Sequence, residues 1–261
     1  MFKKEFKEVF KPTLIFTIII ALMFGVIILL YPYMMGDITN QIDELLNTMP
    51  EGLLKAFNMD LLSISKASGW VLSEGYMMLT LAGAIFFGFI GSNILLKEET
   101  SKTIFFLATK PVKRNDILRT KILAGLLCIL LFNIVVSGIM FITLLIVEEQ
   151  LLKQMIILFV SSFLIDTLLF MISLMVSTFM YKGGVTIGIS MAVVFISYIL
   201  LIVSKISDKV ENIKYASIFF YSDSKFIIDN NFNVINYLVL ISLCVISFVV
   251  SLKKYNRKEL F

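Results

Sequence analysis

Two polar side chains interrupt long apolar runs of this chain. Asp166 lies about twelve residues into the run that begins near residue 155, which is ~18 Å deep at the rise of an α-helix. Asn133 lies about twelve residues into the preceding run and reaches a similar depth if that run is also helical. A carboxylate at such a depth is costly, so a substrate or proton role is one interpretation of Asp166. The other is a structural hydrogen bond between neighbouring helices, with the carboxyl group protonated.

Other kinds of site chemistry have few residues to support them. The chain contains no histidine, which excludes imidazole metal ligands and Ser-His or Cys-His nucleophiles. The stretch GGVTIGIS has glycines but lacks the lysine of a phosphate-binding P-loop. Cys128 and Cys244 both lie in apolar runs and are expected to be free thiols. We therefore expect no metal and no cofactor bound by this chain.

The elements that position these residues are membrane spans. Of the 261 residues, 59% are hydrophobic and 16% charged, and the mean hydropathy is +0.94. Six continuous apolar runs are long enough to cross a bilayer as helices, and they lack the alternation of barrel strands. The predicted fold is an all-α integral membrane protein with spans at residues 13–31, 71–96, 122–147, 155–181, 185–203 and 234–252.

Charge predicts how these spans are oriented. With six spans, both termini and the connections after the second and fourth spans share one side of the membrane. Sixteen of the 23 Lys and Arg residues fall on that side. Cytoplasmic segments carry such an excess, so both termini are predicted to be cytoplasmic.

The connections carry shorter amphipathic pieces. Residues 1–12 place phenylalanines on one helical face and lysines on the other, which predicts an N-terminal interfacial helix. We expect another short amphipathic helix in the long outer loop between the first two spans. Residues 205–233 form an outer insertion, with aromatic residues suited to the membrane interface. Lys-Gly-Gly at 182–184 predicts a tight turn between antiparallel helices.

The cytoplasmic loop of residues 97–121 differs from the rest of the chain. It predicts a short helix that exposes apolar residues near Ile104 and Leu107, a break at Pro111, and a restart with Asn115 as N-cap. Such a helix suits a groove on a soluble partner, with the basic residues steering the encounter. It equally suits a lipid surface, and the residues alone leave both interpretations open.

This loop resembles one found in bacterial ABC-transporter permeases, in the six-helix exporter family that includes peptide-toxin, bacteriocin and drug exporters. Their pattern is close to E-E-x-x-G-T-[IL]-x-x-L-L-[AS]-x-P-[VI]-[ST]-R-x-x-[IL]-[IL]-x-[ST]-K. Departures from it include Lys102 for glycine and Lys113 for serine or threonine. The matching residues are Glu98, Glu99, Thr103, Ile104, Leu107, Pro111, Val112, Arg114, Ile117, Leu118, Thr120 and Lys121, and Ala108 stands at the second leucine.

The resemblance implies that the loop holds a cytoplasmic coupling helix that docks on a separate ABC ATPase. The assembly would contain two ATPase subunits, which bind ATP and Mg, and a second permease subunit, either identical or a sister chain. The implied activity is export of amphipathic or lipophilic cargo, such as an antimicrobial peptide, a toxin or a drug, across a bacterial cell membrane. The implied ATPase-docking residues are Glu99, Thr103, Ile104, Phe105, Leu107, Pro111 and Arg114.

Three other functional classes are alternatives to an ABC permease. An ion-coupled secondary transporter would use Asp166 as its proton site, but it gives no reason for the basic loop. A non-transporting membrane anchor of a soluble complex would share the docking loop. An intramembrane enzyme is disfavoured because the chain has no histidine and the predicted spans hold no cluster of acidic residues around Asp166. The lipid bilayer is an expected partner and nucleic acid is not.

Overall fold

The computed structural model describes residues 2–48, 75–100, 114–146, 152–206, 208–223 and 233–258. Within these ranges the fold is almost entirely helical and contains no strand, which confirms the predicted class. In the described part of the chain, six helices are long and apolar enough to cross a membrane. The helices are α1 (Phe2–Thr48), α5 (Tyr76–Thr100), α7 (Arg114–Ile146), α8 (Leu152–Phe179), α9 (Gly183–Ile206) and α11 (Val234–Arg257).

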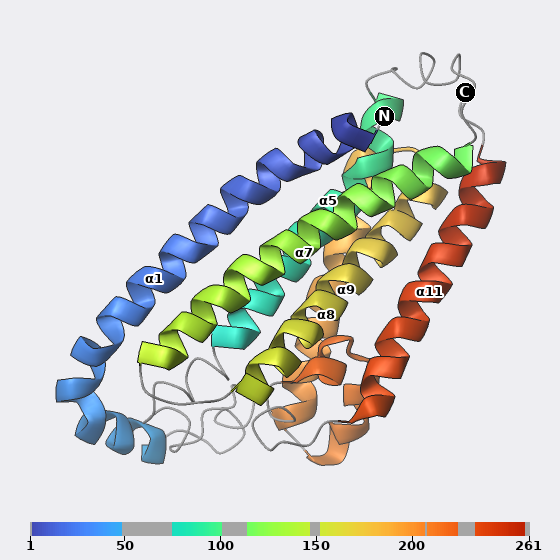
Figure 1. The fold of residues 1–261 in the computed structure, drawn as a ribbon. Helices are drawn as coiled ribbons and strands as arrows, with labels where there is room; N and C mark the ends of the chain where they lie inside the picture. The colour runs from blue at the N-terminus through green and yellow to red at the C-terminus, as the bar shows by residue number, and fades with distance from the viewer. Residues whose placement is uncertain are drawn as a thin grey trace.

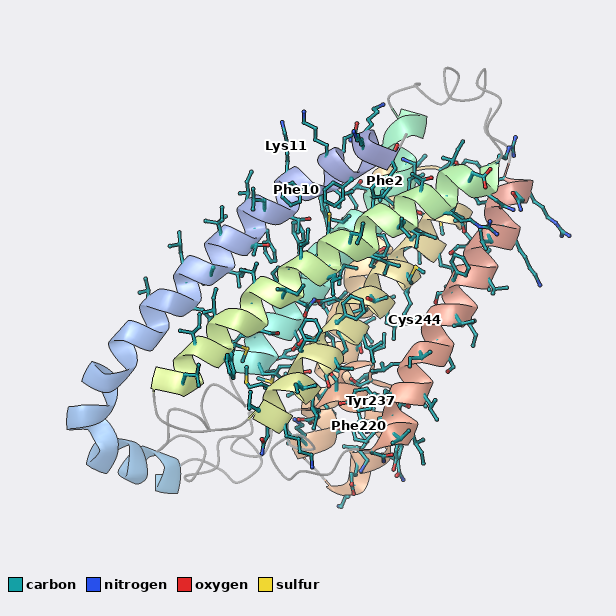
Figure 2. The ribbon with its side chains drawn as sticks, in the orientation of Figure 1. Phe2, Phe10, Lys11, Phe220, Tyr237 and Cys244 are labelled. Atoms are coloured by element: carbon teal, nitrogen blue, oxygen red, sulfur yellow. The ribbon has the colours of Figure 1, made fainter. Side chains whose placement is uncertain are left out.

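The helices form one elongated bundle with both chain ends at the same end of it (Figure 1). We call this the terminal end; it also holds the last turn of α5 and the first turn of α7. Two 3₁₀ helices, η2 (Asp208–Ala216) and η3 (Phe219–Ser222), lie between α9 and α11 at the opposite end. Phe2, Phe10 and Lys11 lie toward the terminal end and Phe220 and Tyr237 toward the opposite one (Figure 2).

The centre of the bundle is the contact between α5 and α8. In their apolar spans 67% and 61% of residues are buried, against 22% in α1 and in α11. The outer helices therefore present broad apolar faces to lipid or to another subunit. An aromatic cluster joins α1 to this centre: the Phe16 ring stacks on Phe86 of α5 at 4.2 Å between centroids and lies 5.6 Å from Phe132 of α7.

Glycines let α5 and α7 approach α8 closely. An added Cβ at Gly91 would overlap the backbone carbonyl of Phe170, and one at Gly125 would overlap the Phe170 ring. An added Cβ at Gly83 would lie 2.6 Å from a carboxyl oxygen of Asp166. Small residues at such positions allow close packing of membrane helices.

Several helices extend beyond the predicted apolar runs, whereas α8 ends at Phe179, before the predicted span end at residue 181. The α7 helix already includes Arg114 and Asn115, so Asn115 lies within the helix and the predicted N-cap at this residue is wrong. Its side-chain oxygen accepts no hydrogen bond in the structure. The α1 helix is continuous across residues 12 and 13, so the N-terminal amphipathic segment and the first predicted span form one helix. Where the membrane surface meets α1 stays a prediction.

The Lys-Gly-Gly turn has the form expected from the sequence. The α8 helix ends at Phe179, and α9 begins at Gly183 and packs antiparallel beside it (Figure 1). The Lys182 carbonyl accepts hydrogen bonds from the backbone amide and the hydroxyl group of Thr186, at 3.1 and 3.0 Å. The two helices therefore form a tight hairpin.

Candidate functional site

Most of the predicted docking residues lie outside the described residues. These are Thr103, Ile104, Phe105, Leu107 and Pro111. Glu99 is placed in the last turn of α5, and Arg114 opens α7. The described helices thus place both ends of the loop of residues 97–121 at the terminal end of the bundle, beside the two chain ends (Figure 1).

Arg114 makes contacts within the chain. Its Nη1 atom donates a hydrogen bond of 2.8 Å to the backbone carbonyl of Lys258 and a longer one of 3.5 Å to that of Asn256. The guanidinium group therefore binds the end of α11 and the residue that follows it. The docking role that the resemblance implies for Arg114 stays a prediction.

Two ion pairs attach the start of α1 to the helices that flank the loop. Glu5 pairs with Lys121 of α7 at 2.8 Å, and both side chains are almost fully buried. Glu8 pairs with Lys97 of α5 at 2.6 Å, where both side chains are partly exposed. A buried charge pair is retained only with good geometry, because each charge loses its hydration. The start of α1 is thus connected to both sides of the loop.

The two intramembrane polar residues meet in the structure. The amide nitrogen of Asn133 on α7 donates a hydrogen bond of 2.9 Å to Oδ2 of Asp166 on α8, and another of 3.0 Å to the Ile129 carbonyl. Both side chains are 1% exposed. Asp166 Oδ1 has no hydrogen-bond partner, and its carboxyl group lies against Gly83 of α5. The pair therefore sits where three helices meet.

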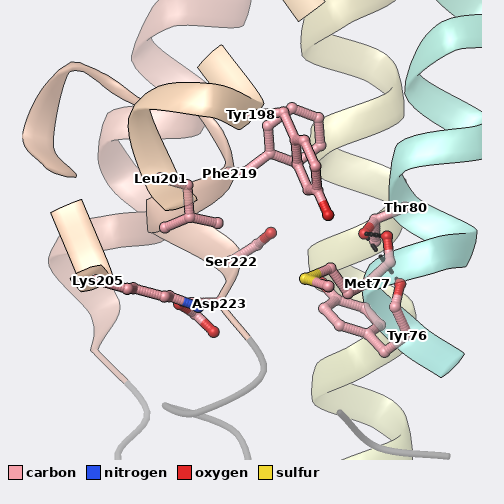
Figure 3. A pocket seen from close by; sticks show the side chains of 9 residues that line it. All are labelled: Tyr76, Met77, Thr80, Tyr198, Leu201, Lys205, Phe219, Ser222 and Asp223. Atoms are coloured by element: carbon pink, nitrogen blue, oxygen red, sulfur yellow. Dashed lines mark hydrogen bonds and ion pairs between the residues drawn. The ribbon is translucent and has the colours of Figure 1, made fainter. Parts of the chain in front are cut away.

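A small cavity lies at the opposite end, between α5, α9 and η3 (Figure 3). Its volume is about 20 Å³, enough for a single water molecule. Lys205 and Asp223 lie side by side at its edge and form an ion pair of 2.6 Å. The Tyr198 and Phe219 rings meet edge to face at 5.7 Å. In this conformation the cavity is too small for a peptide or a drug.

The outer insertion is held on α9 by hydroxyl groups. The Ser217 hydroxyl donates a hydrogen bond of 2.7 Å to the Ser197 carbonyl, and the Ser197 hydroxyl accepts one of 2.7 Å from the Ile218 amide. Glu211 and Lys214 pair on the surface of η2, which lowers the pKa of Glu211 and raises that of Lys214. The described part of the insertion is therefore folded against the bundle.

The described ranges contain no candidate metal site. No group of three or more His, Cys, Asp or Glu side chains lies close enough there to hold a metal ion. Cys128 and Cys244 are both free thiols.

Sequence reasoning missed the residues that connect helices at the terminal end. Glu5 pairs with a residue 116 positions away, and Lys258 reaches α8 across 78 positions or more. The only signal for Glu5 was an acidic residue within the lysine-rich start of the chain. Lys258 carried no signal beyond its charge.

Comparison with known proteins gives one match. A family model described as ABC-2 family transporter protein matches residues 1–260. No curated protein and no solved structure matches the chain.

Proposed function

Because the chain belongs to the ABC-2 family of transporter proteins and is the permease subunit of an ABC transporter, we propose that it exports amphipathic or lipophilic cargo. A separate ATPase, docked on residues 97–121, drives the export. The proposed location is a bacterial cell membrane, with both termini cytoplasmic.

The observation that carries the proposal is the family match over nearly the whole chain. In this family the basic, amphipathic loop has a role in docking an ATPase, which a helix that only lies on the lipid surface would not have. The geometry of the terminal end supports this role, because the loop joins α5 to α7 and the ion pairs at Lys97 and Lys121 attach both helices to α1. A force applied at the loop therefore acts directly on three helices.

The source of energy is proposed to be a partner chain. The 261 residues contain no G-x-x-x-x-G-K-[ST] motif, so ATP and Mg are assigned to an ATPase subunit. We propose two ATPase copies and two permease subunits, identical or sister chains, with the pathway between the permeases. ATP closes the ATPase pair, the loops move together, and the pathway opens outward. Cargo and ATP must each bind one of the two states more tightly for this cycle to run.

The cargo class follows from the character of the pathway walls. The outer helices present apolar surfaces, including Phe195, Ile196 and Ile199 of α9. Such surfaces suit peptides, toxins or drugs with a large apolar part. The small cavity at the opposite end lies within one subunit and is too small for such cargo, so the proposed pathway stays between the two permeases.

The docking claim is tested by purifying the tagged chain with a co-expressed ABC ATPase encoded beside it. We expect a stable complex that hydrolyses ATP. Phe105→Asp together with Leu107→Asp removes apolar contact surface and should abolish association. The matched control is Leu53→Asp together with Phe226→Asp, which makes the same changes in the predicted outer segments and should leave association intact.

The opposite result has a clear meaning. If the folded chain binds no ATPase with either pair of substitutions or without them, the ABC assembly is wrong for this chain. The ion-coupled alternative then takes its place, because Asp166 is a buried carboxyl group with a single hydrogen-bond donor.

A further inference from the structure

Lys258 closes the end of α8 from outside that helix. Lys258 directly follows α11, and only 2% of its surface is exposed. Its ammonium group donates hydrogen bonds of 2.7 Å to the Met180 carbonyl and 3.2 Å to the Ser177 carbonyl. The last carbonyls of a helix lack partners within it and carry partial negative charge, so a lysine there is a favourable cap.

Aromatic contacts add to this cap. The Lys258 ammonium lies 4.9 Å from the centre of the Tyr181 ring, just beyond α8. The neighbouring Lys254 ammonium lies 5.1 Å from the Phe179 ring. Both are cation-π distances. Two lysines from the end of α11 thus hold the last turn of α8.

Arg114 binds the same segment from the other side. Its hydrogen bonds to the carbonyls of Lys258 and Asn256 connect the first turn of α7 to the end of α11. The acceptors are backbone atoms, so this contact fixes the position of the chain at Lys258 and not merely one side chain. The Lys258 side chain in turn connects this point of the chain to the end of α8 through its hydrogen bonds.

We propose that Arg114 and Lys258 form a clasp that transmits displacement of the α7 start to the α8–α9 hairpin. A buried ammonium group is costly without its hydrogen bonds, so the last turn of α8 moves together with Lys258. The tight turn at residues 180–182 passes this movement on to α9. Both are positioning residues, and the proposal rests on the ATPase-driven function above.

The clasp assigns Arg114 a role different from the one implied by the family pattern. There, the arginine is a docking residue. Here it binds the end of α11, so its loss should disconnect ATP binding from α8 even where the ATPase still associates. This difference makes the two roles separable by experiment.

The test uses the full chain in lipid nanodiscs with its co-purified ATPase. The variants are Arg114→Gln and Lys258→Met, with Arg119→Gln and Lys253→Met as exposed, charge-matched controls. Amide hydrogen exchange is followed in peptides covering residues 174–186, without nucleotide and then with ATP and vanadate. Lys258→Met should speed exchange at the end of α8 about tenfold, the size of a lost helix cap.

Nucleotide should change exchange at residues 174–186 in the unmodified chain and in both controls. In the two clasp variants this response should be lost. In Lys258→Met, which lies outside the docking loop, the ATPase should still co-purify and hydrolyse ATP. The double variant should be no worse than either single one, because both break the same connection. Arg114→Lys and Lys258→Arg keep a charged donor and should restore the response.

Two results would overturn the clasp. The first is unchanged exchange at the end of α8 in Lys258→Met, and it needs no ATPase. The second is a nucleotide response that survives in both clasp variants. Failure of the unmodified chain to bind any ATPase contradicts the proposed function and the transmission role together, whereas the first measurement still shows whether the cap exists.

Discussion

Asn133 of α7 and Asp166 of α8 form a polar contact within the apolar spans. The depth of each residue along its run predicts that the two side chains lie at one level. Their hydrogen bond of 2.9 Å and the close approach to Gly83 come from the structure. The geometry favours a structural junction of three helices, because the carboxyl group receives one amide bond and fills a space left by a glycine.

The junction predicts how substitutions at Asp166 behave. Asp166→Asn keeps the size of the side chain and an acceptor for Asn133, so thermal stability and ATP hydrolysis by the complex should change little. Asp166→Leu removes that acceptor and should cost about 1–2 kcal/mol, as for hydrogen bonds between membrane helices. The check is the thermal midpoint of the purified chain together with its ATPase rate. A folded Asp166→Asn complex without activity would instead indicate a proton or substrate role.

The ion pair of Glu5 and Lys121 gives a second residue-level prediction. Glu5→Gln removes the carboxylate that pairs with the buried Lys121 ammonium and should destabilise the chain by about 3 kcal/mol, because Glu8 still acts on that charge. Glu8→Gln is the matched control, because its partner Lys97 is 56% exposed and such pairs contribute at most ~1 kcal/mol. Fluorescence-detected size exclusion after heating compares the two. Equal losses would contradict the difference in burial.

These pairs also show why part of the site was beyond sequence reasoning. The polar residues at mid-membrane stand out against an apolar background, so their chemistry is visible in one dimension. Glu5, Lys121 and Lys258 lie among many other charges, and their partners depend on the register between helices. That register is set by packing, here by rings such as Phe16 on Phe86 and by the glycines facing Phe170.

At the scale of elements, six spans were predictable because hydropathy marks them directly. The helix ends were less so, since backbone hydrogen bonding continues past the apolar run. The α7 helix starts at Arg114, close to the predicted restart at Asn115 and before the predicted span at residue 122, and α11 continues to Arg257, beyond the predicted span end at 252. The extended ends carry the contacts of the terminal end, which is why those contacts were missed.

The interface between α5 and α8 predicts a strong dependence on small residues. Gly91→Ala places a methyl group against the Phe170 carbonyl and should cost about 1–3 kcal/mol by overpacking. Gly188→Ala in α9 is the control, because nothing lies within 4 Å of the added carbon. It should be neutral or gain up to ~1 kcal/mol from helix propensity. The thermal midpoints of the two purified variants measure this difference in stability. A Gly91→Ala variant as stable as the unmodified chain would contradict this packing.

At the scale of the whole molecule, the account depends on which side the terminal end faces. Lys253 near the end of α11 and Lys209 in η2 are both exposed and lie at opposite ends of the bundle. In a chain carrying Cys128→Ala and Cys244→Ala, an impermeant maleimide should label Lys209→Cys in intact cells. Lys253→Cys should react only after the membrane is opened. The reverse pattern would place the basic loop outside and exclude a cytoplasmic ATPase partner.

The central claim is that an ATPase docks on the loop between α5 and α7, and cross-linking in living cells tests it most directly. A photoreactive phenylalanine analogue replaces Phe105, or Phe226 as control, and the cross-linked proteins are identified by mass spectrometry. The account predicts a cross-link from position 105, and not from 226, to a protein with a P-loop. A loop that cross-links to no ATPase, in cells that contain the folded chain, would contradict it.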